Sequence, residues 1–264
     1  MKYLQSNTLA KLARISTLRM VFLSQASHVA SSLSLIDILS VIVANTKLSE
    51  TKEFGSDLVV SKGHAAAGTY AVLAHAGYLP LNFLEEYSKD GAKLGGHVTS
   101  HPVPVIPLST GSLGHGLSFG VGRSIAKKYF GKYEETFVVM SDGECNEGSV
   151  WEAAMFAGHH ELSGMSVVID RNGLQSLKGT EDTLRLEPLE DKWRSFGWDV
   201  SVCDGHDHIQ LKRELFRIST KPRVIIANTI KGKGVSFMEN SVMWHYKSPS
   251  ESEFTRAIEE LENS

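Results

Sequence analysis

The amino acid sequence predicts an α/β fold: a doubly wound, mostly parallel sheet with helices on both of its faces. From residue 137 onward, short β-branched runs alternate with stretches of helical periodicity, which is typical of parallel strands joined by helical crossovers. The 264 residues are 42% hydrophobic and 22% charged, which suits a globular chain with a sizeable core. We therefore expect residues 1–264 to form a single domain.

The expected strands and helices follow from the spacing of apolar residues. The strands are predicted at 57–60, 137–140, 165–170, 198–203 and 223–229. A first helix is predicted over 4–27, and a second is expected to begin at Ser34, because serine is a favoured N-cap residue. Further helices are predicted over 115–129, 151–160, 189–196 and 209–218. Residues 91–120 are rich in Gly, Pro and His and predict a long ordered loop of functional importance.

Composition excludes several classes of function. There are 27 Lys plus Arg against 30 Asp plus Glu, and no basic block occurs, so a nucleic-acid partner is not expected. Cys145 and Cys203 form neither a disulfide framework nor a zinc-ligand spacing, which favours a reducing, cytoplasmic location. No run of about 18 apolar residues exists, so no membrane span is expected. The eleven histidines include no HExxH motif of zinc hydrolases.

Polar residues follow two successive predicted strands. Asp142 and Gly143 come after 137–140, and Asn172 comes after 165–170. One crossover separates them, so both should lie at the carboxyl edge of the sheet, where open α/β folds bind ligands. Each piece alone is most often a simple turn, but the pair offers hard oxygen ligands that suit magnesium or calcium. A helix starting near Gly148 would point its N–H groups to the same edge, which predicts a metal–diphosphate site.

This pattern resembles the transketolase family of thiamine-diphosphate enzymes, and the resemblance covers nearly the whole chain. The motifs occur in the family's order: SKGH (61–64), GYLP (77–80), STGSLG (109–114), EG (147–148), AGH (157–159), DRNGLQ (170–175), KGKG (231–234) and WH (244–245). The resemblance implies thiamine diphosphate as cofactor, with Mg²⁺, or Ca²⁺ or Mn²⁺ in its place.

The resemblance also implies roles for individual residues. The metal would be held by Asp142, Asn172 and the backbone carbonyl of Leu174. Cofactor contacts would come from His64, Gly111, Ser112, Leu113, Gly143, Glu144, Asn172 and His245. The catalytic side chains would be His28, His64, His97 and Glu147, of which Glu147, with Glu152, resembles the acidic pair at the family's dimer interface. Imidazoles suit these roles because they exchange protons near neutral pH.

Some positions depart from the family pattern. Ser141 replaces the usual first glycine before Asp142, Ala30 and Ser31 stand where glycines commonly follow the first histidine, and His115 replaces a common glutamine. The last three lie on the substrate side, so we expect an unusual donor or acceptor.

The family also needs a glutamate that hydrogen-bonds the cofactor's aminopyrimidine ring, and this residue belongs to a second, pyrimidine-binding domain. Only nineteen residues follow His245, too few for that domain. We therefore expect a partner chain, the carboxy-terminal transketolase subunit, to supply it, in an α2β2 assembly.

The expected reaction is transfer of a two-carbon ketol unit between sugars or sugar phosphates. Two alternatives remain open: part of a thiamine-diphosphate enzyme that uses pyruvate or another 2-oxoacid, and a noncatalytic phosphate-binding module. The second lacks the usual phosphate-loop motifs, since residues 111–116 read GxxGxG.

Overall fold

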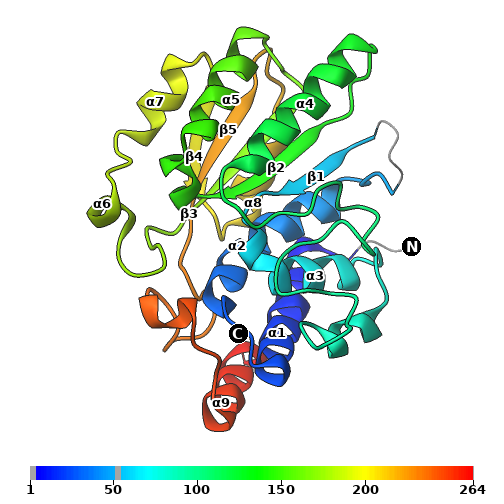
Figure 1. Cartoon of the computed structure of the whole chain (residues 1–264), viewed down its shortest axis with the longest axis vertical. Helices are drawn as coiled ribbons and strands as arrows, with labels where there is room; N and C mark the ends of the chain where they lie inside the picture. Colours follow the sequence, from blue (N-terminus) through cyan, green and yellow to red (C-terminus); the bar gives the residue numbers. More distant parts are fainter. Residues whose placement is uncertain (1–3, 51–54, 264) are drawn as a thin grey trace.

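The sheet lies at the centre of the molecule. The computed structural model describes residues 4–50 and 55–263, and within them five strands pair in the order β1-β2-β3-β5-β4, all parallel (Figure 1). Their bounds are β1 Asp57–Val60, β2 Thr136–Ser141, β3 Met165–Arg171, β4 Asp199–Asp204 and β5 Arg223–Asn228. In β2, Phe137 and Val139 face one buried core, and Val138 and Met140 face the other. Alternation of this kind buries both faces of the sheet.

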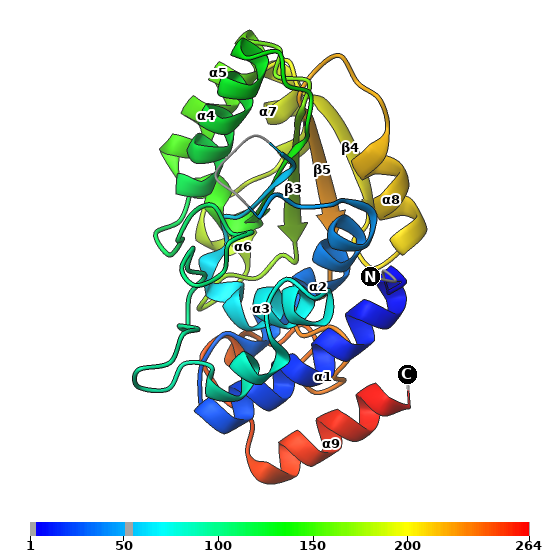
Figure 2. The same cartoon turned by 90° about the vertical axis from the view of Figure 1, so that its right-hand side faces the viewer.

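Helices cover both faces. On one side lie α4 His115–Tyr129, α5 Gly148–His159 and α7 Leu189–Ser195. The core of the other side includes residues of α1 Ser6–Ser24, α2 Val29–Asn45, α3 Ala66–His75, α8 His208–Phe216 and α9 Glu251–Glu262. Figure 2 shows α4 and α5 on one side of the strands, α8 on the other, and α9 outside α1. The predicted α/β fold with helices on both faces is thus confirmed.

Short turns complete the chain. The helix α6 spans Thr180–Thr183, and 3₁₀ turns occur at Gly63–Ala65, Leu81–Glu86, Asp142–Asn146 and Val242–His245. No helix among the described residues has the length and apolarity that a membrane crossing requires.

The start of α2 differs from the prediction. The helix begins at Val29, and its N-cap is His28, in the left-handed region with φ 70°, so the predicted N-cap at Ser34 is wrong. Ser34 lies inside the helix, where its hydroxyl donates to Asp170 Oδ2 (2.6 Å). A tertiary contact with β3 therefore satisfies the polar group that suggested a cap.

Candidate functional site

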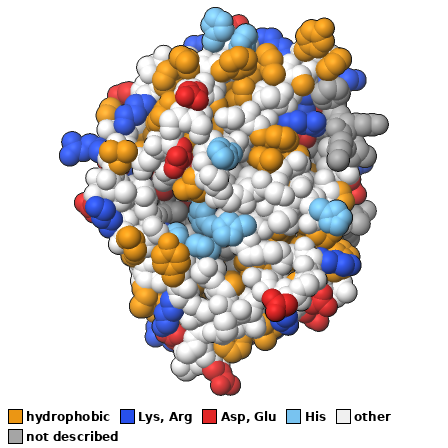
Figure 3. Space-filling model, viewed as in Figure 1, with side chains coloured by type: hydrophobic (Ala, Val, Ile, Leu, Met, Phe, Trp, Pro, Cys, Tyr) orange, Lys and Arg blue, Asp and Glu red, His pale blue; other side chains and the backbone are white. Residues whose placement is uncertain are grey.

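A cavity of about 270 Å³ lies at the carboxyl edge of the sheet, where β2 and β3 end. It is lined by His28, Ser31, His64, His97, Gly111, Leu113, Ser141, Asp142, Gly143, Asn172, Leu174, Gln175, Ser176, Lys231, His245 and Tyr246. Histidine side chains gather near the middle of the face seen in Figure 3. The cavity thus joins segments that are far apart in the sequence.

Most of the sequence-predicted site residues line this one cavity. They are His28, His64, His97, Gly111, Leu113, Asp142, Gly143, Asn172, Leu174 and His245. The structure does not bring Ser112, Glu144 or Glu147 into its wall.

Oxygen donors form one side of the cavity. Asp142 Oδ1 accepts from the backbone N–H of Gly143 (2.8 Å), and its Oδ2 accepts from that of Gly173 (2.8 Å). Burial raises the pKa of this carboxyl group. The Asn172 amide oxygen accepts from Leu174 N–H (3.1 Å), which forms a tight turn beside Asp142. A carboxylate, an amide oxygen and a backbone carbonyl are a donor set that fits a hard divalent cation.

Imidazoles form another side. The ring centroid of His28 lies 5.4 Å from that of His64, 5.8 Å from that of His97 and 4.8 Å from that of His245. Burial, with nearby positive charge, lowers the pKa of His28 to about 4 and that of His245 to about 3, and it lowers the pKa of His64 well below 6.5. These three rings are therefore neutral at neutral pH. Nδ1 of His28 is buried without a hydrogen-bond partner among the described residues, which is an open position for a ligand.

Two buried lysines complete the site, and the sequence interpretation gave them no role. Lys231 Nζ donates to the carbonyls of Leu174 (3.1 Å) and Gln175 (3.1 Å) and contacts His245 Nδ1 (3.0 Å). Burial lowers the pKa of Lys231 to about 8. Lys62 pairs with Asp170 at the end of β3 and donates to the carbonyl of Ser31 (3.2 Å).

The lysine signal was present in the sequence. Both lysines belong to quoted motifs, SKGH and KGKG, but only the fold shows that these side chains are buried. Buried cations beside a cavity favour an anionic ligand.

Glu144 has a supporting place outside the cavity. It is fully buried, and its carboxylate accepts from Ser61 Oγ, from Gly114 N–H (3.0 Å) and from Ser141 N–H (2.8 Å). It therefore holds the loop before α4 against the end of β2, and the expected direct contact with the cofactor is corrected to this indirect role. All of its acceptor capacity serves protein donors, which local sequence reading cannot show.

Ser112 and Glu147 are exposed. Glu147 precedes α5, and Glu152 is exposed on that helix. Neither Ser112 nor Glu147 contacts the cavity wall in this chain, so any role for them requires another molecule.

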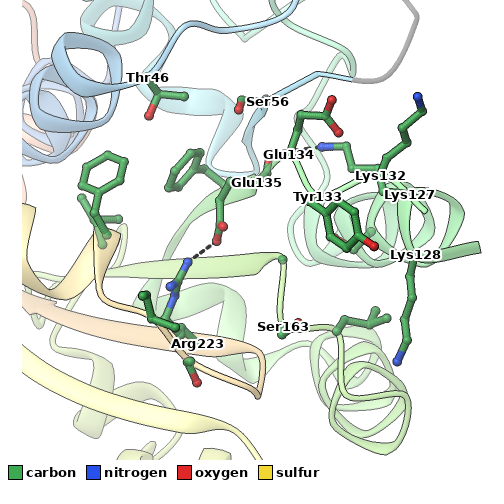
Figure 4. Close-up of a pocket in the computed structure, with 18 of the residues that line it drawn as sticks. Thr46, Ser56, Lys127, Lys128, Lys132, Tyr133, Glu134, Glu135, Ser163 and Arg223 are labelled. Atoms are coloured by element: carbon green, nitrogen blue, oxygen red, sulfur yellow. Dashed lines mark hydrogen bonds and ion pairs between the residues drawn. The ribbon is translucent and has the colours of Figure 1, made fainter. Parts of the chain in front are cut away.

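A second cavity, of about 680 Å³, lies at the amino edge of the sheet (Figure 4). Its buried charges are paired within the protein: Arg223 with Glu135, and Lys127 with Asp57. Parallel α/β sheets bind their ligands at the carboxyl edge. Fold position and free polar groups therefore favour the smaller cavity as the functional site.

The fold and this site define a class, a cofactor-binding α/β domain, and comparison with known proteins defines the family. Residues 5–261 match the family model described as the transketolase, thiamine diphosphate binding domain. The chain belongs to the transketolase family and is a thiamine-diphosphate-binding domain.

Relatives of similar length include separate subunits. A subunit of the apulose-4-phosphate transketolase of Actinobacillus succinogenes is 40% identical over 242 residues, which cover 89% of this chain and 88% of that protein. The 6-deoxy-6-sulfo-D-fructose transketolase subunit SqwG of Clostridium sp. is 36% identical, with 98% of this chain and 95% of that one covered.

Single-chain transketolases are longer. The chain is similar to the transketolase structure from Campylobacter jejuni, with a TM-score of 0.90 and 26% identity, over 99% of this chain and 43% of that one. Rat transketolase is 32% identical over 94% of this chain and 40% of its own length. The chain therefore spans about two-fifths of these proteins.

Proposed function

We propose that the chain is the thiamine-diphosphate-binding subunit of a two-chain transketolase that transfers a two-carbon ketol unit from a ketose, or ketose phosphate, to an aldose. The observation that carries the proposal is the carboxyl-edge cavity, where oxygen donors, buried lysines and neutral imidazoles meet within one family domain. Similarity to separately encoded subunits over nearly their whole length supports the two-chain form.

Asp142, the Asn172 side chain and the Leu174 carbonyl would hold Mg²⁺, or Ca²⁺ or Mn²⁺, against the cofactor's diphosphate. Gly143, His64 and His245 would contact the diphosphate, and Lys231 beside them would balance its charge. Gly111 and Leu113 would lie against the aminopyrimidine. When bound, the cofactor would supply the electron sink for breaking and forming the carbon–carbon bond.

The chain's histidines would handle protons and substrate hydroxyls. His28, His64 and His97 line the same cavity, and the first two are neutral at neutral pH, so their ring nitrogens can accept a proton. The buried, unpartnered Nδ1 of His28 would accept a hydrogen bond from a substrate hydroxyl. An imidazole held neutral is ready to act as a base without first losing a proton.

The partner would be the carboxy-terminal subunit that carries the pyrimidine-binding domain and its glutamate. Two of the similar proteins are named as single subunits of an apulose-4-phosphate transketolase, and single-chain transketolases extend well beyond the length matched here. We further propose an α2β2 assembly in the cytoplasm, with the exposed Glu147 acting at an interface between chains. Residues 1–264 would then form one domain, with the pyrimidine domain on the partner chain.

The substrate class is proposed as sugars or sugar phosphates. Relatives are named for apulose-4-phosphate and 6-deoxy-6-sulfo-D-fructose, both ketoses with an anionic group. Assays with the partner present and hydroxypyruvate, xylulose 5-phosphate or pyruvate as donor separate ketol transfer from 2-oxoacid chemistry. Turnover of pyruvate alone would replace this proposal with the 2-oxoacid alternative.

The binding proposal is tested by calorimetry with thiamine diphosphate and Mg²⁺. Asp142→Ala should abolish binding and leave the circular dichroism spectrum intact, because it removes the one carboxylate of the donor set. Asp191→Ala is the matched control, since Asp191 is an exposed residue of α7 paired with Arg194. Undiminished binding by Asp142→Ala would refute the assignment. A chain that turns over a ketose donor at full rate without a partner would refute the two-chain form.

A further inference from the structure

Arg171, the last residue of β3, joins the proposed metal ligand Asp142 to the segment that follows the sheet. Its Nη1 donates to Asp142 Oδ2 (3.2 Å) and to Thr180 Oγ1 (2.6 Å). Its Nη2 donates to Glu181 Oε1 (2.8 Å) and to Glu187 Oε1 (3.0 Å). One planar guanidinium thus binds four side chains at once, a geometry that arginine supports and lysine does not.

The same contacts enclose the turn that carries the other proposed ligands. Gly173 N–H donates to Asp142 Oδ2 (2.8 Å), and Gly173 O accepts from Thr180 N–H (2.9 Å). Leu174 forms a β-bridge with Gly179. The turn of residues 172–174 is therefore fixed on one side by Asp142 and on the other by Thr180, and Arg171 contacts both.

Charge decides whether Arg171 would compete with a cation or prepare its site. The guanidinium carries one positive charge, and Glu181 and Glu187 together carry two negative ones, so this group of three is not a net positive charge beside Asp142. Arg171 and Gly173 both contact Oδ2, whereas Oδ1 accepts from Gly143 N–H. Oδ1 keeps a lone pair for a further ligand.

We propose that Arg171 is a positioning residue of the metal site: it holds Asp142 and the 172–174 turn at a fixed spacing by tying both to the 180–187 segment. This inference rests on the proposed function, because it takes Asp142 and the turn as ligands of the cofactor's metal. Contacts that orient a metal ligand without touching the metal commonly determine affinity by 10- to 100-fold.

The test measures how much Mg²⁺ is needed for half-maximal binding of thiamine diphosphate by calorimetry. Arg171→Met should raise that Mg²⁺ concentration by about 10- to 100-fold, and excess Mg²⁺ should restore binding. Arg171→Lys should lie between the variant and the wild type, because an ammonium reaches Asp142 but cannot bridge all four partners. Arg194→Met is the matched control, since Arg194 makes only exposed pairs on α7 with Glu190 and Asp191, and it should leave the Mg²⁺ requirement unchanged.

Hydrogen exchange gives a second readout. The amides of Gly173 and Thr180 should exchange faster in Arg171→Met without cofactor, and those of the strands should not. If Arg171→Met fails to fold, the Mg²⁺ requirement and exchange rates of Arg171→Lys decide the question alone.

Two outcomes overturn the inference. A Mg²⁺ requirement that is unchanged in both variants means that Arg171 does not position the site, and a lowered requirement means that it competes with the cation. Wild-type binding separates the two levels of argument: if the wild type binds thiamine diphosphate with Mg²⁺ and Asp142→Ala does not, only the role of Arg171 has failed. If the wild type itself does not bind, the proposed function has failed.

Discussion

The two edges of the sheet treat buried charge in opposite ways. At the amino edge, Arg223 pairs with Glu135, and Lys127 pairs with Asp57. At the carboxyl edge, Lys231 contacts carbonyl oxygens and an imidazole. A cation paired with a carboxylate stabilises the fold, whereas a cation left with neutral partners is costly until an anion arrives. The difference indicates which edge serves structure and which serves binding.

The largest expected effect is on stability and belongs to the amino edge. Arg223→Met should lower the free energy of unfolding by about 3 kcal/mol, because it breaks a largely buried pair and leaves the Ser166 hydroxyl and Glu135 without their donor. Urea denaturation measures the loss. The affinity for thiamine diphosphate should not change, and a large loss of affinity in the folded variant would mean that the two edges are not separate in function.

Lys231→Met should show the reverse pattern. Cofactor affinity should fall by about 10- to 100-fold, which corresponds to losing a charge-assisted hydrogen bond to the diphosphate. Stability without cofactor should stay equal or rise, since the variant removes a buried cation that lacks a carboxylate partner. Calorimetry and urea denaturation on the same preparation test both statements. A destabilised variant with unchanged affinity would assign Lys231 to the structure instead.

The carboxyl edge should also make stability depend on pH. Unfolded histidine binds a proton near pH 6.5, whereas folded His28 does so only near pH 4 and the pKa of folded His64 is also lowered. Between these values the unfolded state binds more protons, so the free energy of unfolding should fall as pH drops from 7 to 5. We expect a loss of about 1–2 kcal/mol, allowing for solvent screening of the rings. The double variant His28→Asn, His64→Asn should show a flatter profile, and an unchanged slope would count against neutral rings.

The smallest expected effect concerns an unpartnered hydroxyl at the amino edge. Ser124 Oγ is buried without a hydrogen-bond partner among the described residues, as is Nδ1 of His28 at the other edge. Ser124→Ala should stabilise the chain by less than about 1 kcal/mol, because it removes an unsatisfied polar group. Cofactor affinity should not change. Weaker binding or a clear loss of stability would show that this hydroxyl has a partner or ligand.

Much of the fold follows from sequence because strand and helix patterns are local. The β-branched runs locate all five strands, and α4 begins and ends at the predicted residues, 115 and 129. The start of α2 could not be predicted in this way. His28 takes a backbone conformation that few residues adopt, and its N–H donates to the carbonyl of His245 (2.8 Å), a contact between distant segments.

The site divides along the same line. Asp142 and Asn172 can be predicted because strand ends of parallel neighbours meet at one edge, and the structure has Ser141 opposite Asp170 in register. Lys62, Lys231 and the hub at Arg171 could not be assigned, because their roles depend on burial and on partners 9 to 108 positions away in sequence. Glu144 shows the opposite error: its motif position suggests ligand contact, but protein donors occupy its carboxylate.

The hydrogen bond from His28 N–H to His245 O has a consequence for biosynthesis. During synthesis, a ribosome-bound chain that has emerged only through β5 holds Asp142 and Asn172, but it lacks the segment that closes the pocket against the start of α2. We expect such a nascent chain to be unable to retain the vitamin-derived cofactor. Loading would then follow translation of this segment, and the coenzyme would act as a late check on correctly finished molecules.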